Sequence, residues 1–254
     1  MTSIVVPGAE PFRADGNRTG ILLSHGFTGS PASMIPWAQH LAALGHTVRV
    51  PRLPGHGTTW REMNRTRWID WYAEVDTALS ELREACDHVI VAGLSMGGCL
   101  ALRLAEQRPL DVDALVLVNP AINLERFDLR LVPALQWIVP AMPGIGNDIK
   151  KPGQDEIGYD RTPLKALASQ LAMWKDVRAG LPKVTQPLLL FRSTDDHVVD
   201  ATSASIILDG VSSTVKELVP LADSFHVATL DHDAPLIFER SAAFIAEHVG
   251  AAHE

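Results

Sequence analysis

The sequence predicts an α/β fold with a mostly parallel central sheet and helices on both of its faces. Short β-like runs alternate with helical patterns along most of the 254 residues, and this alternation is typical of parallel sheets. Several runs are also apolar throughout, among them HVIVAG (88–93) and ALVLVNP (114–120). Strands of this kind are expected where both sheet faces are buried.

The first elements of this alternation lie before residue 60. GILLSHG (Gly20–Gly26) is predicted to be a strand that runs into a glycine turn. Pro31–Gly45 indicates a helix that ends at its glycine, and His46–Gly57 a strand followed by a Pro/Gly loop.

The remaining elements continue the same pattern. Trp68–Cys86 predicts an amphipathic helix, because its apolar residues recur at helical spacing. After it we expect the two apolar strands named above. Two more strands, at Pro187–Ser193 and Ser213–Val219, and a last helix at Ala234–Val249 complete the fold.

Residues between Pro120 and Pro187 break this rhythm, because no clear strand is found there. We expect a small helical cap insertion at 121–182, with 1–120 and 183–254 as the core; a partly disordered loop is the alternative. The insertion is more apolar than an exposed loop requires. We therefore expect Trp137, Ile138 and Trp174 to line an acyl pocket. The alternative, that they only pack the insertion onto the sheet, stays open.

Composition excludes several function classes. The net charge of −8 disfavours nucleic acid and anionic membrane surfaces as partners. Two cysteines, Cys86 and Cys99, make neither a disulfide framework nor a metal site, which favours a cytoplasmic setting. The first residues lack the features of a secretion signal, and no apolar run is long enough for a membrane span.

A serine between glycines carries the strongest chemical signal. GLSMG (Gly93–Gly97) fits the pattern G-x-S-x-G between a predicted strand and a predicted helix. Such a turn is tight, and it lifts the serine hydroxyl beside a helix N-terminus. Ser95 is therefore a candidate nucleophile.

A nucleophilic serine needs a base and an orienting acid. His226 is the candidate base, because it lies between the last predicted strand and the last helix. The acid is expected after the strand PLLLFRS, where Asp195 and Asp196 are adjacent. We favour Asp196, since Val198 and Val199 then return to the core, whereas Asp195 fits a turn position.

Two backbone N–H groups are candidates for an oxyanion hole. One belongs to Met96, the residue after the candidate nucleophile. The other belongs to Phe27, which follows His25 and Gly26 in the loop SHGFTGS. We expect His25 to hold this loop rather than to act as a base.

With these residues in place, the sequence resembles the α/β-hydrolase superfamily, and in particular small bacterial carboxylesterases and monoacylglycerol lipases. The resemblance extends from Thr19 to Val249 and rests on LLSHGFTGSPASM, PRLPGHG, VAGLSMGG, STDDHVV and HVATLDHD. It implies the same nucleophile, acid, base and oxyanion donors, and a small cap. Phe225 is a departure, because many relatives have glycine before the catalytic histidine.

The expected activity is hydrolysis of carboxylic esters with short to medium acyl chains, through an acyl-enzyme and without metal or organic cofactor. The expected partner is a small-molecule ester, and the chain is expected to be a monomer or homodimer. Thioesterase, amidase, carbon–carbon hydrolase and cofactor-free haloperoxidase-like or transferase activities remain alternatives. A non-catalytic binding protein on the same fold is disfavoured, since all three members of the triad are present.

Overall fold

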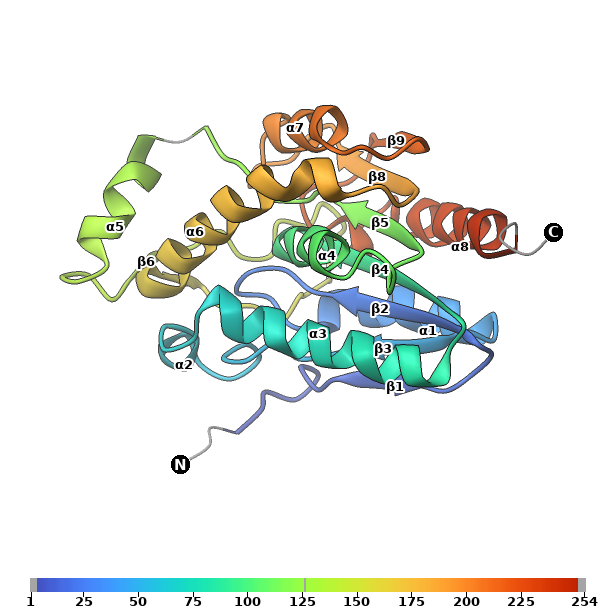
Figure 1. Ribbon diagram of the computed structural model, residues 1–254. Helices are drawn as coiled ribbons and strands as arrows, with labels where there is room; N and C mark the ends of the chain where they lie inside the picture. The colour runs from blue at the N-terminus through green and yellow to red at the C-terminus, as the bar shows by residue number, and fades with distance from the viewer. Residues whose placement is uncertain (1–3, 126, 251–254) are drawn as a thin grey trace.

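The computed structural model describes residues 4–125 and 127–250, and a seven-stranded sheet forms its centre (Figure 1). The strand order is β1-β3-β2-β4-β5-β8-β9, and only the edge pair β1–β3 is antiparallel. The predicted, mostly parallel sheet is therefore confirmed. The strands are β1 (Phe12–Ala14), β2 (Thr19–Ser24), β3 (Thr47–Val50), β4 (His88–Leu94), β5 (Ala114–Val118), β8 (Leu188–Ser193) and β9 (Lys216–Leu221).

Helices cover both faces of the sheet and enclose two apolar clusters. One face is covered by α1 (Ile35–Ala43) and α8 (Ala234–Gly250). The other is covered by α3 (Trp68–Ala85), α4 (Met96–Gln107), α6 (Leu164–Gly180) and α7 (Thr202–Gly210). The remaining elements are short: α2 (Trp60–Met63), α5 (Val132–Leu135), β6 (Ala141–Pro143), β7 (Arg161–Pro163), and 3₁₀ turns at Pro31–Ser33, Phe127–Leu131, Leu181–Lys183 and Ala228–Leu230.

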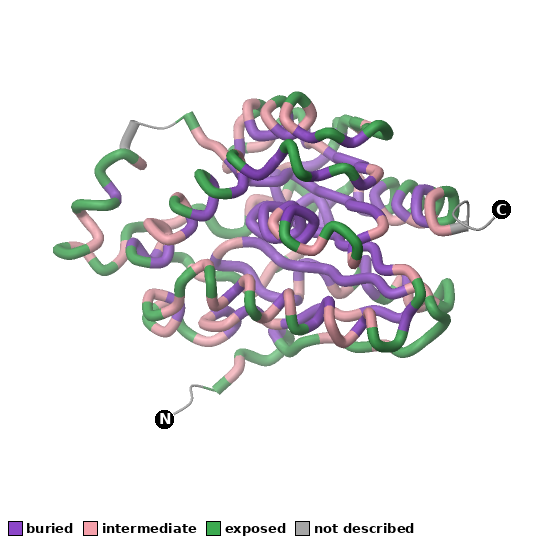
Figure 2. Tube along the Cα trace, viewed as in Figure 1, coloured by how far each residue is buried: buried purple, intermediate pink, exposed green. Residues whose placement is uncertain are grey.

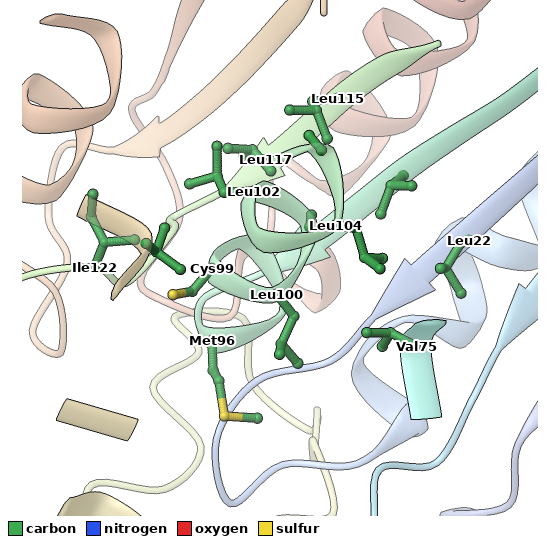
Figure 3. Packing of buried hydrophobic residues seen from close by; sticks show 14 of the residues in the cluster. Leu22, Val75, Met96, Cys99, Leu100, Leu102, Leu104, Leu115, Leu117 and Ile122 are labelled. Atoms are coloured by element: carbon green, nitrogen blue, oxygen red, sulfur yellow. The ribbon is translucent and has the colours of Figure 1, made fainter. Parts of the chain in front are cut away.

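Helix α4 is the best-enclosed helix beside the sheet. Figure 3 shows Leu100 and Leu104 of α4 on the side of Leu22 of β2 and Val75 of α3, and Leu102 on the side of Leu115 and Leu117 of β5. Each fully buried leucine of this kind contributes about 1.5–3 kcal/mol. The start of α4, directly after Ser95, is therefore held by a rigid part of the core.

The segment between β5 and β8 leaves the sheet and returns through α6. Figure 1 shows α5 and β6 at one side of the molecule, away from the sheet, and Figure 2 shows that α5 is only partly buried. In contrast, α6 packs on α4, and its residues Ala166, Met173 and Val177 are buried in the apolar cluster that contains α4. We propose 121–182 as the extent of the insertion.

Besides the helices α2 and α7, which the sequence did not predict, three details differ from the sequence prediction. The strands β6 and β7 form a small antiparallel pair where no strand was expected, because three residues containing a proline carry no readable alternation. The edge strand β1 was missed for the same reason of length. The last strand is shifted to Lys216–Leu221.

Candidate active site

The backbone at Ser95 is strained, and its flanking glycines permit that conformation. Ser95 has φ +55° and ψ −116°, a region that L-residues rarely adopt. A Cβ on Gly93 would lie 2.2 Å from the carbonyl carbon of Gly97, and one on Gly97 would lie 2.0 Å from the carbonyl oxygen of Ser24. Only glycine fits at both positions, which explains the G-x-S-x-G pattern.

Neighbouring strands hold this turn in place. The Ser95 N–H donates to the Val118 carbonyl at 3.0 Å, and the Ser95 carbonyl accepts from Gly98 and Ala121 at 3.0 and 3.1 Å. The Met96 N–H is the first of helix α4, where backbone donors lack an acceptor within the helix and the helix dipole is positive. The side chain of Met96 is buried in the core (Figure 3). The backbone N–H is therefore the group of Met96 that is a candidate for binding a ligand.

Asp196 and His226 meet at the carboxyl ends of the strands. His226 Nδ1 donates to Asp196 Oδ2 at 2.9 Å, and these side chains are 8% and 2% exposed. Asp196 Oδ1 accepts from the N–H groups of Val198 and Val199, each at 2.8 Å. Asp195, in contrast, is 67% exposed. The structure therefore sets Asp196, and not Asp195, against His226.

Charges at this pair favour the ionised forms. Burial disfavours the Asp196 carboxylate, but His226 and the two backbone donors outweigh it and lower the pKa of Asp196. Burial also disfavours a charged His226, yet Asp196, Glu156 and Asp148 together raise the pKa of His226 above its ordinary value. The pair is suited to accept a proton at His226 Nε2 and to stabilise the imidazolium that forms.

The loop after β2 lies against Ser95. A Cβ on Gly26 would come within 3.3 Å of Ser95 Cβ. His25 holds this loop: its Nδ1 donates to the Gly26 carbonyl at 3.0 Å, and its Nε2 accepts from the Leu53 N–H at 3.2 Å. Burial lowers the pKa of His25 to about 4, so the ring is neutral and serves as scaffold. Phe27, the next residue, turns its ring edge-on to Trp71.

A cavity of about 450 Å³ opens at the strained turn that carries Ser95, and Ser95, His226 and Phe27 all line it. Trp174 lines the cavity as expected. Trp137 and Ile138 are not part of the lining and are 76% and 83% exposed, so their predicted place in the pocket is corrected. They follow the end of α5, where the chain turns outward. The apolar lining comes instead from Leu124, Leu129, Val132, Leu135, Met142, Leu164 and Leu167.

Comparison with known proteins gives the family. The sequence model of the family described as "Serine aminopeptidase, S33" matches residues 16–233. The chain belongs to this family.

Relatives of this S33 chain agree in sequence and fold. It is 43% identical to a thermostable monoacylglycerol lipase of Bacillus sp. (strain H-257), over 97% of this chain and 98% of that protein. A carboxylesterase of Bacillus subtilis (strain 168) is 26% identical over 93% and 95%. A solved structure from work on the metagenome-derived lipolytic enzymes LipS and LipT superposes with a TM-score of 0.94 at 43% identity, covering 96% of this chain and all of that one. The predicted α/β-hydrolase resemblance is therefore confirmed.

Sequence reasoning missed residues that fasten the His226 loop of this S33 hydrolase. Asn119 Nδ2 donates to the His226 carbonyl at 2.8 Å, and Ser193 Oγ donates to the Phe225 carbonyl at 2.8 Å. Asn119 directly follows the apolar strand β5, and Ser193 is the last residue of the apolar strand β8. A polar residue at the end of such a strand is a signal that could have identified both. Asp148 and Glu156 also line the cavity, but no pattern in the insertion singles them out.

Three further observations complete the description of residues 4–125 and 127–250. No helix in residues 4–125 and 127–250 is both long and apolar enough to cross a membrane. Within the same ranges, no group of three or more His, Cys, Asp or Glu residues is arranged to hold a metal ion. Cys86 and Cys99 are free and buried.

Proposed function

We propose that the chain hydrolyses carboxylic esters of short to medium acyl chains, monoacylglycerols among them, with Ser95 as nucleophile, His226 as base and Asp196 as orienting acid. One observation carries this proposal: Ser95, on its strained turn, and His226, held by Asp196, line the same cavity. The relatives named monoacylglycerol lipase and carboxylesterase support the substrate class.

In the acylation step, His226 Nε2 takes the proton of the Ser95 hydroxyl while Ser95 Oγ bonds to the ester carbonyl carbon. The negative charge then rests on the former carbonyl oxygen, where the N–H groups of Phe27 and Met96 stabilise it. A single donor of this kind is worth roughly 100–1000-fold in rate. Collapse of the intermediate breaks the ester C–O bond, and the imidazolium gives its proton to the leaving alcohol.

In the deacylation step, His226 takes a proton from water as the water oxygen bonds to the acyl carbon. Collapse of this second intermediate breaks the bond to Ser95 Oγ, and His226 returns the proton to the serine. The products are the carboxylic acid and the free enzyme. These steps require no metal or organic cofactor.

The cavity lining supports an ester with an apolar acyl chain and a small polar alcohol. The apolar residues from α5, β6 and α6 offer a surface of limited length for the acyl chain. Glu156 lines the same cavity. Its Oε2 lies next to Gly29, in the loop that contains Phe27, because a Cβ built on Gly29 would be 3.1 Å from this oxygen. A carboxylate there can accept hydrogen bonds from alcohol hydroxyl groups.

We further propose a cytoplasmic enzyme that is a monomer or a homodimer. Two buried thiols without a disulfide support a reducing compartment.

Release of nitrophenol from nitrophenyl butyrate tests the proposed function. We expect turnover by the wild type and loss of at least about 1000-fold in Ser95→Ala. Acyl esters, monoacylglycerols and acyl thioesters are then compared at equal concentration. Faster turnover of acyl thioesters would make a thioesterase the better description, and no turnover of any of them by the wild type would contradict the proposal.

A further inference from the structure

The segment 147–151 of the insertion, called the strap below, crosses the loop that carries His226. Its carboxylate Asp148 binds that loop directly: Asp148 Oδ2 accepts from the His226 N–H at 3.1 Å. The Asp148 carbonyl accepts from the Val227 N–H at 3.0 Å. The strap therefore holds the backbone on both sides of the His226 side chain.

Asp148 also binds the loop that carries Asp196. Its Oδ1 accepts from His197 Nδ1 at 2.8 Å, and its Oδ2 lies 3.3 Å from the His197 N–H, which donates to it. The Asp148 side chain is only 11% exposed, whereas the His197 ring that it faces is half-exposed. One partly buried carboxylate thus joins the loops of the base and of its orienting acid.

A second carboxylate makes the matching contact in the opposite direction. Asp231, in the His226 loop, is 1% exposed and accepts from the N–H groups of Lys150 and Lys151 at 2.7 and 2.9 Å. It also accepts from Phe225 and His232 within its own loop. The strap and the loop hold each other through two carboxylates, one from each side.

The contact between the strap and the His226 loop also explains why a bulky residue stands at Phe225. Its ring packs edge-on to His197 with 4.5 Å between centroids, and Lys150 Nζ lies 5.9 Å from its ring centre. Phe225 is absent from the cavity lining. The Phe225 ring therefore packs between the strap and the His197 side chain and does not narrow the cavity.

We propose that Asp148 is a positioning residue for His226, acting from the insertion through the His226 backbone, through His197 and through its own charge; this rests on the proposed role of His226 as base. The insertion then has a second task beside covering the cavity, because it completes the support of the catalytic histidine.

Charge makes this role measurable. His226 faces three carboxylates, Asp196, Glu156 and Asp148, and each raises its pKa. Asp148 itself faces the imidazole of His197, whose pKa it raises, and Asp195 lies 3.6 Å from the other side of that ring. Farther out, Lys150 pairs with Asp223.

Asp148→Asn removes the charge but keeps an oxygen for the backbone donors, whereas Asp148→Ala removes both. Because the base must be neutral, kcat/KM falls as the pH drops through the pKa of His226. We expect Asp148→Asn to move this acid limb about 0.5–1 unit to lower pH. In Asp148→Ala we expect the same shift and a kcat loss of about 10- to 100-fold with a smaller change in KM.

Two matched variants separate the charge from general damage. His197→Gln removes the imidazole that faces Asp148, whose protonated form opposes a positive charge on His226, so the acid limb should move to higher pH. Asp160→Asn removes an exposed carboxylate of the same insertion and should leave the limb in place. Melting temperatures show whether each variant is folded.

Titration of the His226 ring by NMR, in Ser95→Ala with and without Asp148→Asn, gives the pKa without any turnover. A lowered His226 pKa supports the proposal even if the natural reaction is not ester hydrolysis. If the wild type hydrolyses esters and Asp148→Asn behaves like Asp160→Asn in both measurements, the inference is wrong while the proposed function stands.

Discussion

Replacing Asp196 by asparagine should nearly abolish turnover, because the structure fixes how the new amide must lie. Asp196 Oδ1 accepts from the N–H groups of Val198 and Val199, so the asparagine oxygen stays on that side. Its NH₂ group then faces His226 Nδ1. In the wild type this nitrogen donates to Asp196 Oδ2 at 2.9 Å, so in the variant two donors would face each other. The imidazole must place its proton on Nε2, and that nitrogen can no longer accept the serine proton.

The expected loss in kcat is about 10⁴-fold, the size seen for the same change in one serine protease. This corresponds to about 5 kcal/mol of transition-state stabilisation. The matched control is Asp195→Asn, at an adjacent carboxylate that is 67% exposed and 3.6 Å from His197 Nε2. Its loss should stay within about twofold, as for exposed ion pairs in general. Hydrolysis of nitrophenyl butyrate measures both, and equal losses in the two variants would refute the tautomer argument.

Three further predictions concern the turn at Ser95, the cavity and the core. Gly97→Ala should lose at least about 100-fold in kcat and melt at lower temperature, because its Cβ would lie 2.0 Å from the Ser24 carbonyl oxygen; a variant with half the wild-type activity would contradict the close approach. In a nitrophenyl ester series from about two to sixteen carbons, kcat/KM should peak near four to ten carbons, as a pocket of this size allows. Trp174→Ala should move that peak and Trp137→Ala should not, since only Trp174 lines the cavity; an unmoved peak in Trp174→Ala would contradict this. Burial raises the pKa of Glu106 to about 7 despite its ion pair with Arg103, so the folded state binds this proton more tightly than the unfolded state. The free energy of unfolding should therefore fall by up to about 3 kcal/mol between pH 4.5 and 7, and urea titrations should show that Glu106→Gln lacks this fall; identical slopes would argue against it.

Local rules predicted the parts of the site that lie on the regular core. The strand, glycine turn and helix around Ser95 are consecutive in sequence, and steric limits on the backbone leave few residue types for such a turn. The choice of Asp196 over Asp195 followed from where the next apolar pair re-enters the core. Val199 is indeed buried, and Asp196 faces His226.

Contacts between distant segments could not be predicted in this way. Apolar composition alone placed Trp137 and Ile138 in the pocket, but composition does not say which side of a short helix faces inward. Asp148 meets His226 across 78 positions of sequence, and its own neighbours carry no recognisable motif. Such contacts depend on how the insertion folds back onto the core.

Labelling with an organophosphonate, followed by mass spectrometry of the modified peptide, tests the central claim most directly, because it asks which hydroxyl is the nucleophile. The account predicts a single adduct on Ser95, formed as activity is lost, and much slower labelling in Asp196→Asn. Ser24, Ser193 and Ser224 are each at most 1% exposed and should remain unmodified. An adduct on one of them, or full inhibition with Ser95 unmodified, would contradict the assignment of Ser95.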